Sequence, residues 1–359
     1  MKSTKDAISV KWVPKKAVNK YMVDENLKKC EETGQFTNYG PNIHSLEKFV
    51  HKNLKIDESK AVICVCNGSI AIHVLSAVFG YEQNKSRPLN WGTQSFTFPP
   101  SAQNILDPVT IIDIDKEGGP DLEKVPDDIE GLIVTNIFGN VVDIQKYTKW
   151  SEETHKFLIF DNAATPFTVY KGKNACNYGH GSIISFHHTK PLGFGEGGAI
   201  IVDKIYEQSV RRLINFGLDN HHPTVKWHPA GTNGKMSDIS AIYILQYLTK
   251  AEDIIVHHHA LYEYLHRKLC DKDYVELYPN FSDGTPFVSC FCLIFSEYKD
   301  ELRKELISKD FYCRKYYKPL SPTPKALEIY NKILCIPCTI DVSTGDLDFF
   351  VKTLETYYE

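Results

Sequence analysis

Short apolar runs alternate with amphipathic stretches through the first two-thirds of the chain. The runs are rich in β-branched residues, as buried strands are, and cover residues 61–66, 109–114, 131–139, 156–160, 181–186 and 198–202. Between them, residues 68–80 carry apolar side chains at helical spacing and stop at a glycine, and residues 143–155 are also helical in pattern. Strands that alternate with helices form mainly parallel sheets covered on both faces. We therefore predict a large α/β domain with a mainly parallel mixed sheet.

The pattern changes near residue 250. Residues 235–270 are helical in pattern throughout, and apolar runs at 286–295, 311–317 and 333–337 follow before a last helical stretch at 346–358. A new set of strands behind a long helix predicts a second, smaller α+β domain. The predicted domains are residues 1–250 and residues 251–359.

Composition narrows the class of protein. Hydrophobic residues make up 42% of the 359 residues, and the net charge of −4 gives no general attraction to nucleic acid or to membranes. No apolar run is long enough to span a bilayer, and the N-terminus lacks the apolar segment of a signal peptide. We expect a cytoplasmic protein without a nucleic-acid or membrane partner.

Neither the ten cysteines nor the histidine run indicates a metal site. Cys64 with Cys66, and Cys290 with Cys292, alternate within strand-like runs, where cysteine serves as a small hydrophobe. Residues 335–338 (CIPC) have the spacing of a zinc or redox pair, but no second such pair or fitting histidine pair accompanies them. The three histidines at 257–259 point in different directions on a helix and are expected at the surface. We predict no metal.

Chemistry-bearing side chains follow three of the predicted strands. The backbone amides of Gly68, Ser69 and Ile70 and the Ser69 hydroxyl open a helix and can hold a phosphate, although a simple helix cap also explains the serine. Asp161 ends another strand, as a helix cap or turn residue also would, and Lys190 lies between two further strands. Because ligands bind at the carboxyl ends of strands in open α/β sheets, we expect these groups to converge.

This combination suits pyridoxal phosphate. That cofactor takes a lysine as its covalent anchor, a carboxylate beside its pyridine nitrogen, and donors for its phosphate. Lys190 and Asp161 are the candidates for the first two roles, and Ser185 offers a further hydroxyl. A surface lysine, the usual fate of this residue type, is the alternative for Lys190.

With these residues in place, the chain resembles the DegT/StrS-type sugar aminotransferases, which are fold-type-I pyridoxal phosphate enzymes. The resemblance rests on residues 33–49 (TGQFTNYGPNIHSLEKF), 66–75 (CNGSIAIHVL), 94–105 (QSFTFPPSAQNI), 185–198 (SFHHTKPLGFGEGG) and 231–246 (GTNGKMSDISAIYILQ). It implies that Lys190 is the Schiff-base lysine, that Ser185 contacts the phosphate and that Phe98 stacks on the cofactor ring. It also implies that Asn233 reaches the cofactor phosphate of a neighbouring subunit, so the expected assembly is a homodimer with shared active sites.

The resemblance implies a reaction as well. Glutamate, the usual donor of the family, gives its amino group to the cofactor, which then aminates the ketone of a nucleotide-linked sugar. Cations must hold the diphosphate of such a substrate, and Lys235, Arg314 and Lys315 are candidates, each of which also suits a solvated surface. The aromatic pair Tyr316 and Tyr317 either borders the sugar or belongs to the core of the small domain.

The motifs most resemble members that aminate carbon four of a 4-keto-6-deoxyhexose, with dTDP-4-keto-6-deoxyglucose as the preferred substrate and dTDP-4-amino-4,6-dideoxyglucose as product. A carbon-three ketone, another nucleotide, a sugar dehydratase on the same cofactor, and a cofactor-free binding protein are the alternatives. One departure concerns the position three residues after Asp161, where the family often has Gln or His and this chain has Ala164. Asn162 and Thr165 are candidate replacements, whereas His187 and His188 are expected to be structural or to face the substrate.

Overall fold

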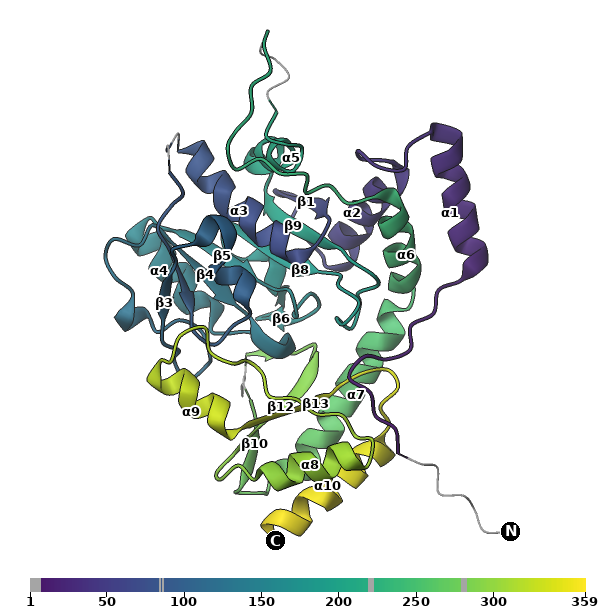
Figure 1. Cartoon of the computed structure of the whole chain (residues 1–359), viewed down its shortest axis with the longest axis vertical. Helices are drawn as coiled ribbons and strands as arrows, with labels where there is room; N and C mark the ends of the chain where they lie inside the picture. Colours follow the sequence, from purple (N-terminus) through teal and green to yellow (C-terminus); the bar gives the residue numbers. More distant parts are fainter. Residues whose placement is uncertain (1–7, 84, 86, 219–222, 279–282) are drawn as a thin grey trace.

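A seven-stranded sheet forms the centre of the larger domain (Figure 1). The computed structural model describes residues 8–83, 85, 87–218, 223–278 and 283–359. The strands are β1 (Lys60–Val65), β2 (Trp91–Gln94), β3 (Thr110–Ile112), β4 (Gly131–Thr135), β5 (Phe157–Asp161), β8 (Gly181–Ser185) and β9 (Gly198–Asp203). Their order is β1-β9-β8-β5-β4-β2-β3, and only β9 runs antiparallel to its neighbours. The predicted mainly parallel mixed sheet is therefore confirmed.

Helices bury both faces of this sheet. They are α2 (Pro41–Asn53), α3 (Gly68–Glu82), α4 (Ile144–Thr154), α5 (Glu207–Ile214) and α6 (Asp238–Leu248), whereas α1 (Lys20–Thr33) packs outside them against α2 and α6. On β1, Ile63 packs with α3 and α5, whereas the next residue, Cys64, packs with α2 and α6. Successive strand residues point to opposite faces, so a strand covered on both sides reads as a continuous apolar run.

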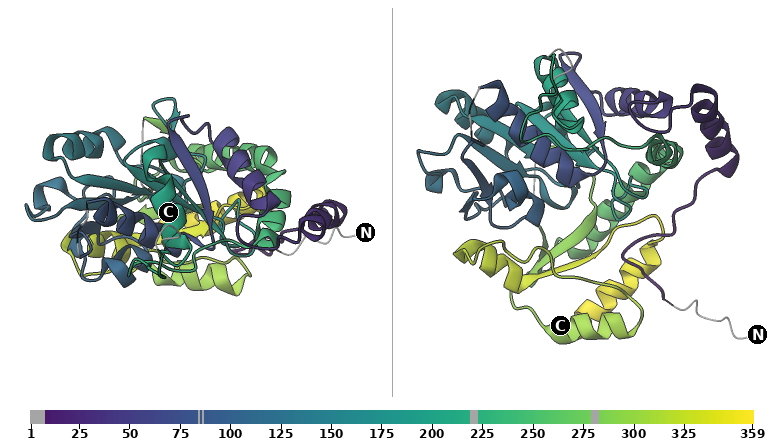
Figure 2. Two further views of the ribbon diagram at one scale, coloured as in Figure 1. Left: turned by 90° about the horizontal axis from the view of Figure 1, so that it is seen from above. Right: turned by 45° about the horizontal axis from the view of Figure 1, so that its top comes forward.

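A three-stranded antiparallel sheet forms the smaller domain. Its strands are β10 (Val275–Leu277), β12 (Cys290–Phe295) and β13 (Ile333–Pro337), in the order β10-β12-β13. The accompanying helices are α7 (Ala251–Leu269), α8 (Asp300–Ser308), α9 (Pro324–Lys332) and α10 (Thr344–Tyr358). Figure 1 shows α7 extending from the large domain into the small one, and Figure 2 shows the same arrangement in two further views. The separation of a smaller α+β unit behind a long helix agrees with the predicted order of elements.

Short elements complete the structure. A second three-stranded sheet joins the domains through β6 (Val169–Tyr170), β7 (Lys173–Asn174) and β11 (Gly284–Thr285). Single turns of 3-10 helix lie at Pro99–Ala102, Asn104–Leu106, Leu122–Lys124, Ile137–Gly139, Ala175–Asn177 and Lys204–Tyr206. Within the described residues, no helix combines the length and the apolar character that crossing a membrane requires.

Three local expectations differ from the structure. The helical stretch predicted over residues 235–270 is two helices, which meet at Thr249 and Lys250. The strand expected over 311–317 makes only isolated bridges, from Phe311 to Val10 and from Arg314 to Cys335, and the end of the run at 131–139 is a 3-10 turn. The last two runs are apolar because they are buried, and their ends meet where Phe138 stacks on Tyr317; burial alone does not distinguish a strand from an irregular segment.

The N-terminal segment packs against the small domain although it precedes the large one in sequence. Val10 is buried in the core of the small domain, and its amide donates to the Asp310 carbonyl oxygen at 3.0 Å. The Tyr312 amide donates back to the Val10 carbonyl oxygen at 2.9 Å. The predicted domain boundary at residue 250 falls between α6 and α7. Residues 8–12 precede this boundary in sequence but pack with the small domain.

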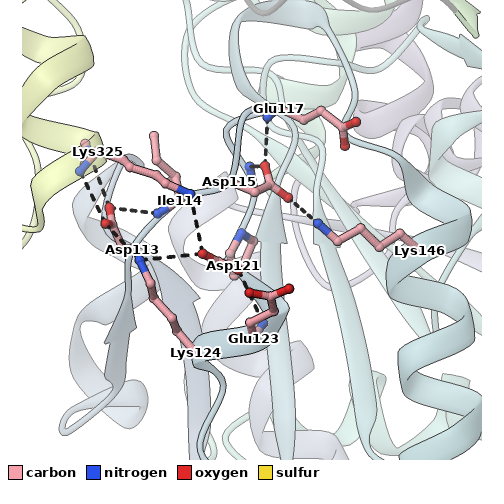
Figure 3. Close-up of polar contacts among 12 residues, drawn as sticks. Asp113, Ile114, Asp115, Glu117, Asp121, Glu123, Lys124, Lys146 and Lys325 are labelled. Carbon is pink, nitrogen blue, oxygen red and sulfur yellow. Dashed lines mark hydrogen bonds and ion pairs between the residues drawn. The ribbon is translucent and has the colours of Figure 1, made fainter.

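An acidic side chain of the large domain holds the beginning of α9. The backbone amides of Lys325 and Ala326 both donate to the Asp113 carboxylate at 3.2 Å, and the Lys124 amine lies 3.3 Å from it (Figure 3). Free amides at a helix N-terminus attract a carboxylate, so Asp113 caps a helix of the other domain. This contact fixes the small domain beside the β3 edge of the large sheet.

Candidate active site

A cavity of about 510 Å³ lies between the two domains. Its walls come from the β1–α3 turn, the ends of β4, β5 and β8, the loop after β8, the start of β12, and Arg314, Tyr316 and Tyr317. The predicted groups Ser69, Phe98, Asp161, Ser185 and Lys190 all line it. The carboxyl ends of neighbouring strands therefore meet here as expected.

The turn into α3 leaves room for an anion between two hydroxyls. The Asn67 side chain caps α3 by accepting from the Ile70 amide at 2.9 Å, which places Gly68 and Ser69 at the cavity. A Cβ added to Gly68 would lie 3.0 Å from the Ser185 Cβ, so only glycine lets these segments approach without crowding. Amides of a helix N-terminus and flanking hydroxyls form a suitable cradle for a phosphate. The Ile70 side chain does not line the cavity.

Asp161 is a buried carboxylate at the end of β5. Its oxygens accept from the Ala163 amide at 2.9 Å and from the Thr135 hydroxyl at 3.4 Å. Burial raises the pKa of Asp161 above its ordinary value, while these donors and the charge of Lys190 act in the opposite direction. A carboxylate in such surroundings is stabilised by a cation placed in the cavity.

Lys190 lies opposite Asp161 on the loop that follows β8. Burial lowers the pKa of its amine from the ordinary value, although the negative charge of Asp161 opposes this. A lysine with a lowered pKa carries more of the neutral, nucleophilic amine near neutral pH. The loop is held by Lys16, whose amine donates to the carbonyl oxygens of Lys190 and Gly193, both at 2.6 Å. Burial lowers the pKa of Lys16 to about 7.

Aromatic side chains form the wall on the side of the small domain. Tyr317 stacks on Phe138 with ring centroids 5.1 Å apart, and its ring lies 6.3 Å from that of Phe98. Phe98 remains 58% exposed, so its face is open to the cavity. Tyr316 also lines the cavity and meets the edge of Trp12 at 5.4 Å.

Of the three predicted cations, Arg314 lines the cavity. Its guanidinium lies over the Trp12 ring at 4.9 Å and donates to the Tyr316 hydroxyl. Lys315 lies outside the lining, because its amine donates to the Asn331 carbonyl oxygen at 3.1 Å and lies over the Tyr298 ring.

The remaining predicted residues divide between the cavity and its surroundings. Lys235 donates to the Asn215 side chain at 2.8 Å, and Asn233 pairs with the backbone of Asn215, so both lie beside the cavity and not in its wall. Ala164 and His187 line the cavity, whereas His188 packs against Phe194.

Neither candidate replacement near Ala164 faces the cavity. The Asn162 side chain donates to the Ser182 hydroxyl at 2.7 Å and accepts from Asn136, and the Thr165 hydroxyl donates to the Asn136 carbonyl oxygen at 2.7 Å. Both side chains therefore tie β4, β5 and β8 together behind the cavity wall.

Sequence reasoning missed Trp12, Asn136, Phe138 and Cys290, all of which line the cavity. Trp12 belongs to the N-terminal segment and Cys290 to a strand of the small domain, so both reach the site only through long-range packing. Phe138 follows β4, and its position directly after a predicted strand is a signal that the sequence did contain.

Comparisons with known proteins identify the family of the chain. The model of the DegT/DnrJ/EryC1/StrS aminotransferase family matches residues 19–355. A Shigella dysenteriae protein named dTDP-4-amino-4,6-dideoxy-D-glucose transaminase is 26% identical over 349 residues, which cover 89% of this chain and 91% of that protein. The GDP-perosamine synthase of Escherichia coli O157:H7 is 23% identical over 296 residues and 80% of each chain.

Solved structures share the fold. Helicobacter pylori PseC, an aminotransferase involved in the biosynthesis of pseudoaminic acid, superposes with a TM-score of 0.85 at 15% identity, over 98% of this chain and 99% of PseC. DesI, solved in the presence of its TDP-sugar product, gives a TM-score of 0.83 at 20% identity, over 98% of this chain and 93% of DesI. Both likenesses extend through the two domains that enclose the cavity.

Proposed function

The chain belongs to the DegT/DnrJ/EryC1/StrS aminotransferase family, and we propose that it moves an amino group from L-glutamate to a nucleotide-linked 4-keto-6-deoxyhexose. It is an aminotransferase that depends on pyridoxal phosphate. The proposed acceptor is dTDP-4-keto-6-deoxyglucose, which would become dTDP-4-amino-4,6-dideoxyglucose. The similarity to the Shigella transaminase over 89% of this chain is the observation that supports this choice.

The residues at the cavity fit the cofactor. The cradle that Gly68 keeps open between Ser69 and Ser185 suits its phosphate. Asp161 is a buried carboxylate on which Lys190 is the charge that acts among the described residues. When bound, pyridoxal phosphate supplies an electron sink for the substrate carbon that carries the nitrogen. Phe98 lines the same cavity, and its ring is exposed enough to contact the cofactor ring.

The protein's own contribution is to place charges and protons. Lys190 can accept a proton at Nζ and return it, because burial lowers the pKa of its amine toward the working range. Asp161 would hold the pyridine nitrogen of the bound cofactor in its protonated form, because burial raises the pKa of this carboxyl and a neighbouring cation would offset that burial. Lys16 keeps the loop of Lys190 in position through two backbone carbonyls.

The wall of the cavity that would contact the sugar contains the guanidinium of Arg314 and several aromatic rings. Arg314 can pair with the diphosphate, and Tyr316, Tyr317 and Trp12 offer faces and hydroxyls to the sugar. Lys235 and Lys315 remain candidates only if the substrate extends beyond the cavity wall. A carbon-three acceptor is the second candidate, supported by the 24% identity to a Pseudomonas aeruginosa aminotransferase named for a 3-oxo sugar, UDP-2-acetamido-2-deoxy-3-oxo-D-glucuronate.

A homodimer in the cytoplasm is part of the proposal. Large apolar side chains are exposed around the segment of Asn233, among them Phe216 at 49% and Trp227 at 65%. An exposed apolar patch of this kind suits a subunit interface, from which Asn233 would reach the phosphate of the partner's cofactor. All ten cysteines are free thiols, as suits a reducing compartment.

Two measurements test the proposed reaction. First, glutamate added to the purified holoenzyme should change the visible spectrum of the cofactor, and Lys190→Ala should abolish the change. Second, nitrogen-15 from labelled glutamate should appear at carbon four of the dTDP sugar. Label at carbon three would favour the second candidate. A deoxygenated sugar without label would replace amino transfer by a dehydratase reaction.

A further inference from the structure

Three thiols converge on the side of the small domain that faces the cavity. The Sγ atoms of Cys290 and Cys292 lie 3.6 Å apart, and those of Cys292 and Cys335 lie 3.3 Å apart. Among the residues that the structure describes, these three are the group of potential metal ligands whose atoms all lie within 4.8 Å of one another. Cys335 belongs to the CIPC run, but its neighbour Cys338 turns instead toward His258.

Strand pairing explains the convergence. Cys290 and Cys292 are two residues apart on β12, so their side chains lie on the same face of the sheet. Cys335 stands directly opposite Cys292 on the antiparallel strand β13. Directly opposed residues have neighbouring Cβ atoms, which brings the third thiol to the first two. The backbone thus arranges the three sulfur atoms before any ligand arrives.

The spacing of the sulfur atoms matches a three-coordinate soft cation. With a metal–sulfur distance of about 2.3 Å, three sulfurs around one trigonal ion lie about 4 Å from each other. Two separations, of 3.6 and 3.3 Å, are slightly shorter than this value, and the third is no more than 4.8 Å. Small rotations of the side chains would therefore suffice.

The surroundings favour a metal over three free thiols. All three cysteines are buried, and they pack in an apolar cluster with Phe96 and Phe138, which excludes competing water. Cys290 also lines the cavity and gives a cation a path from solvent. Three thiolates around a divalent cation carry one net negative charge, and Lys190 lies within electrostatic reach of Cys290 to balance it.

We propose that Cys290, Cys292 and Cys335 form a binding site for a divalent d¹⁰ cation of the zinc and cadmium class. On binding, three metal–sulfur bonds form, and the three thiol protons leave to solvent. No sulfur changes its oxidation state. The site adjoins the proposed cofactor cavity through Cys290, but its three sulfur ligands have no role in the proposed amino transfer and the site does not depend on the identity of the sugar.

Cadmium is the probe, because its bonds to thiolate give an ultraviolet charge-transfer absorption that pyridoxal phosphate and free thiols lack. The reduced holoenzyme would be titrated with Cd²⁺ in a chelating buffer, with the released protons counted by a pH indicator. One Cd²⁺ per chain, close to three protons and a cadmium NMR shift of a three-sulfur site are expected. Absence of the charge-transfer band at saturating buffered Cd²⁺ would overturn the proposal.

Matched cysteine variants locate the site. Cys292→Ser should weaken Cd²⁺ binding by about 100-fold or more, since it removes one of three ligands. Cys270→Ser, which alters an exposed thiol, should leave the affinity unchanged. Cys335→Ala serves as a second ligand variant if Cys292→Ser folds poorly, and circular dichroism checks both. Unchanged affinity in a folded ligand variant, or loss in Cys270→Ser, would place the metal elsewhere.

Discussion

His258 is held as a neutral side chain in the small domain. It lies on α7, is 1% exposed, and its ring stacks on Phe287 at 5.1 Å. Its Nδ1 lies 2.8 Å from the Val288 carbonyl oxygen, which can only accept, so Nδ1 carries the hydrogen. Burial lowers the pKa of His258 to about 4, although the bond to Val288 favours the charged form.

This lowered pKa makes stability depend on pH in a defined window. In the unfolded chain the side chain titrates near 6.5, so between pH 4 and 6.5 the unfolded state binds more protons than the folded state. The contribution of His258 to the free energy of unfolding is complete above pH 6.5 and is lost as the pH falls toward 4. The gap between about 4 and 6.5 corresponds to about 3 kcal/mol.

Urea unfolding of wild type and His258→Gln at several pH values measures this contribution. Glutamine can still donate to the Val288 carbonyl oxygen but does not titrate. Between about pH 7 and about pH 4.5, wild type should lose about 2–3 kcal/mol more stability than the variant. His266→Gln, which alters an exposed histidine of the same helix, should follow wild type. Equal losses in wild type and His258→Gln would refute the argument.

Three further predictions concern the site and the domain contact. Lys16→Met should lower kcat/KM by about 10-fold or more, because it removes two hydrogen bonds to the loop that carries Lys190. Lys15→Met, at an exposed position, should leave kcat/KM unchanged in the same steady-state assay. Gly68→Ala should weaken cofactor binding by about 10-fold, because its Cβ would crowd Ser185, and an absorption titration of the apoenzyme would detect this. Asp113→Asn should lower Tm by about 2–4 °C by weakening the cap of α9, and an unchanged Tm in scanning calorimetry would contradict that role.

The sequence allowed prediction of features that depend on short stretches of chain. Strands buried on both faces appear as continuous apolar runs, so all six runs predicted for the large sheet contain strands. Asp161 and Ser185 could be placed together because parallel strands end at the same edge of a sheet. Ser69 could be placed with them because the turn at Gly68, which opens α3, directly follows a strand of the same sheet.

Contacts between distant segments could not be predicted in this way. His258 was expected at the surface with its neighbours, but α7 crosses the small domain and buries one histidine of the three. Cys292 was interpreted as a small hydrophobe and Cys335 as part of a CIPC run without a second pair, since only the pairing of β12 with β13 brings the two together. The contact of Trp12 with Arg314 likewise joins segments that a local pattern cannot relate.

The part of the cavity that would contact the sugar depends on such distant contacts. The Arg314 amide donates to the Cys335 carbonyl oxygen at 2.9 Å, and the Cys335 amide donates back to Arg314 at 2.7 Å. The segment that carries Tyr317 is thus fixed to β13, while the stack on Phe138 fixes it to the large domain. Because Lys190 and Asp161 come from strand ends of the large domain alone, the cofactor end of the site can stay constant while the other end changes. The small domain thus supplies Arg314, Tyr316 and Tyr317 to the cavity, and the large domain supplies Lys190 and Asp161.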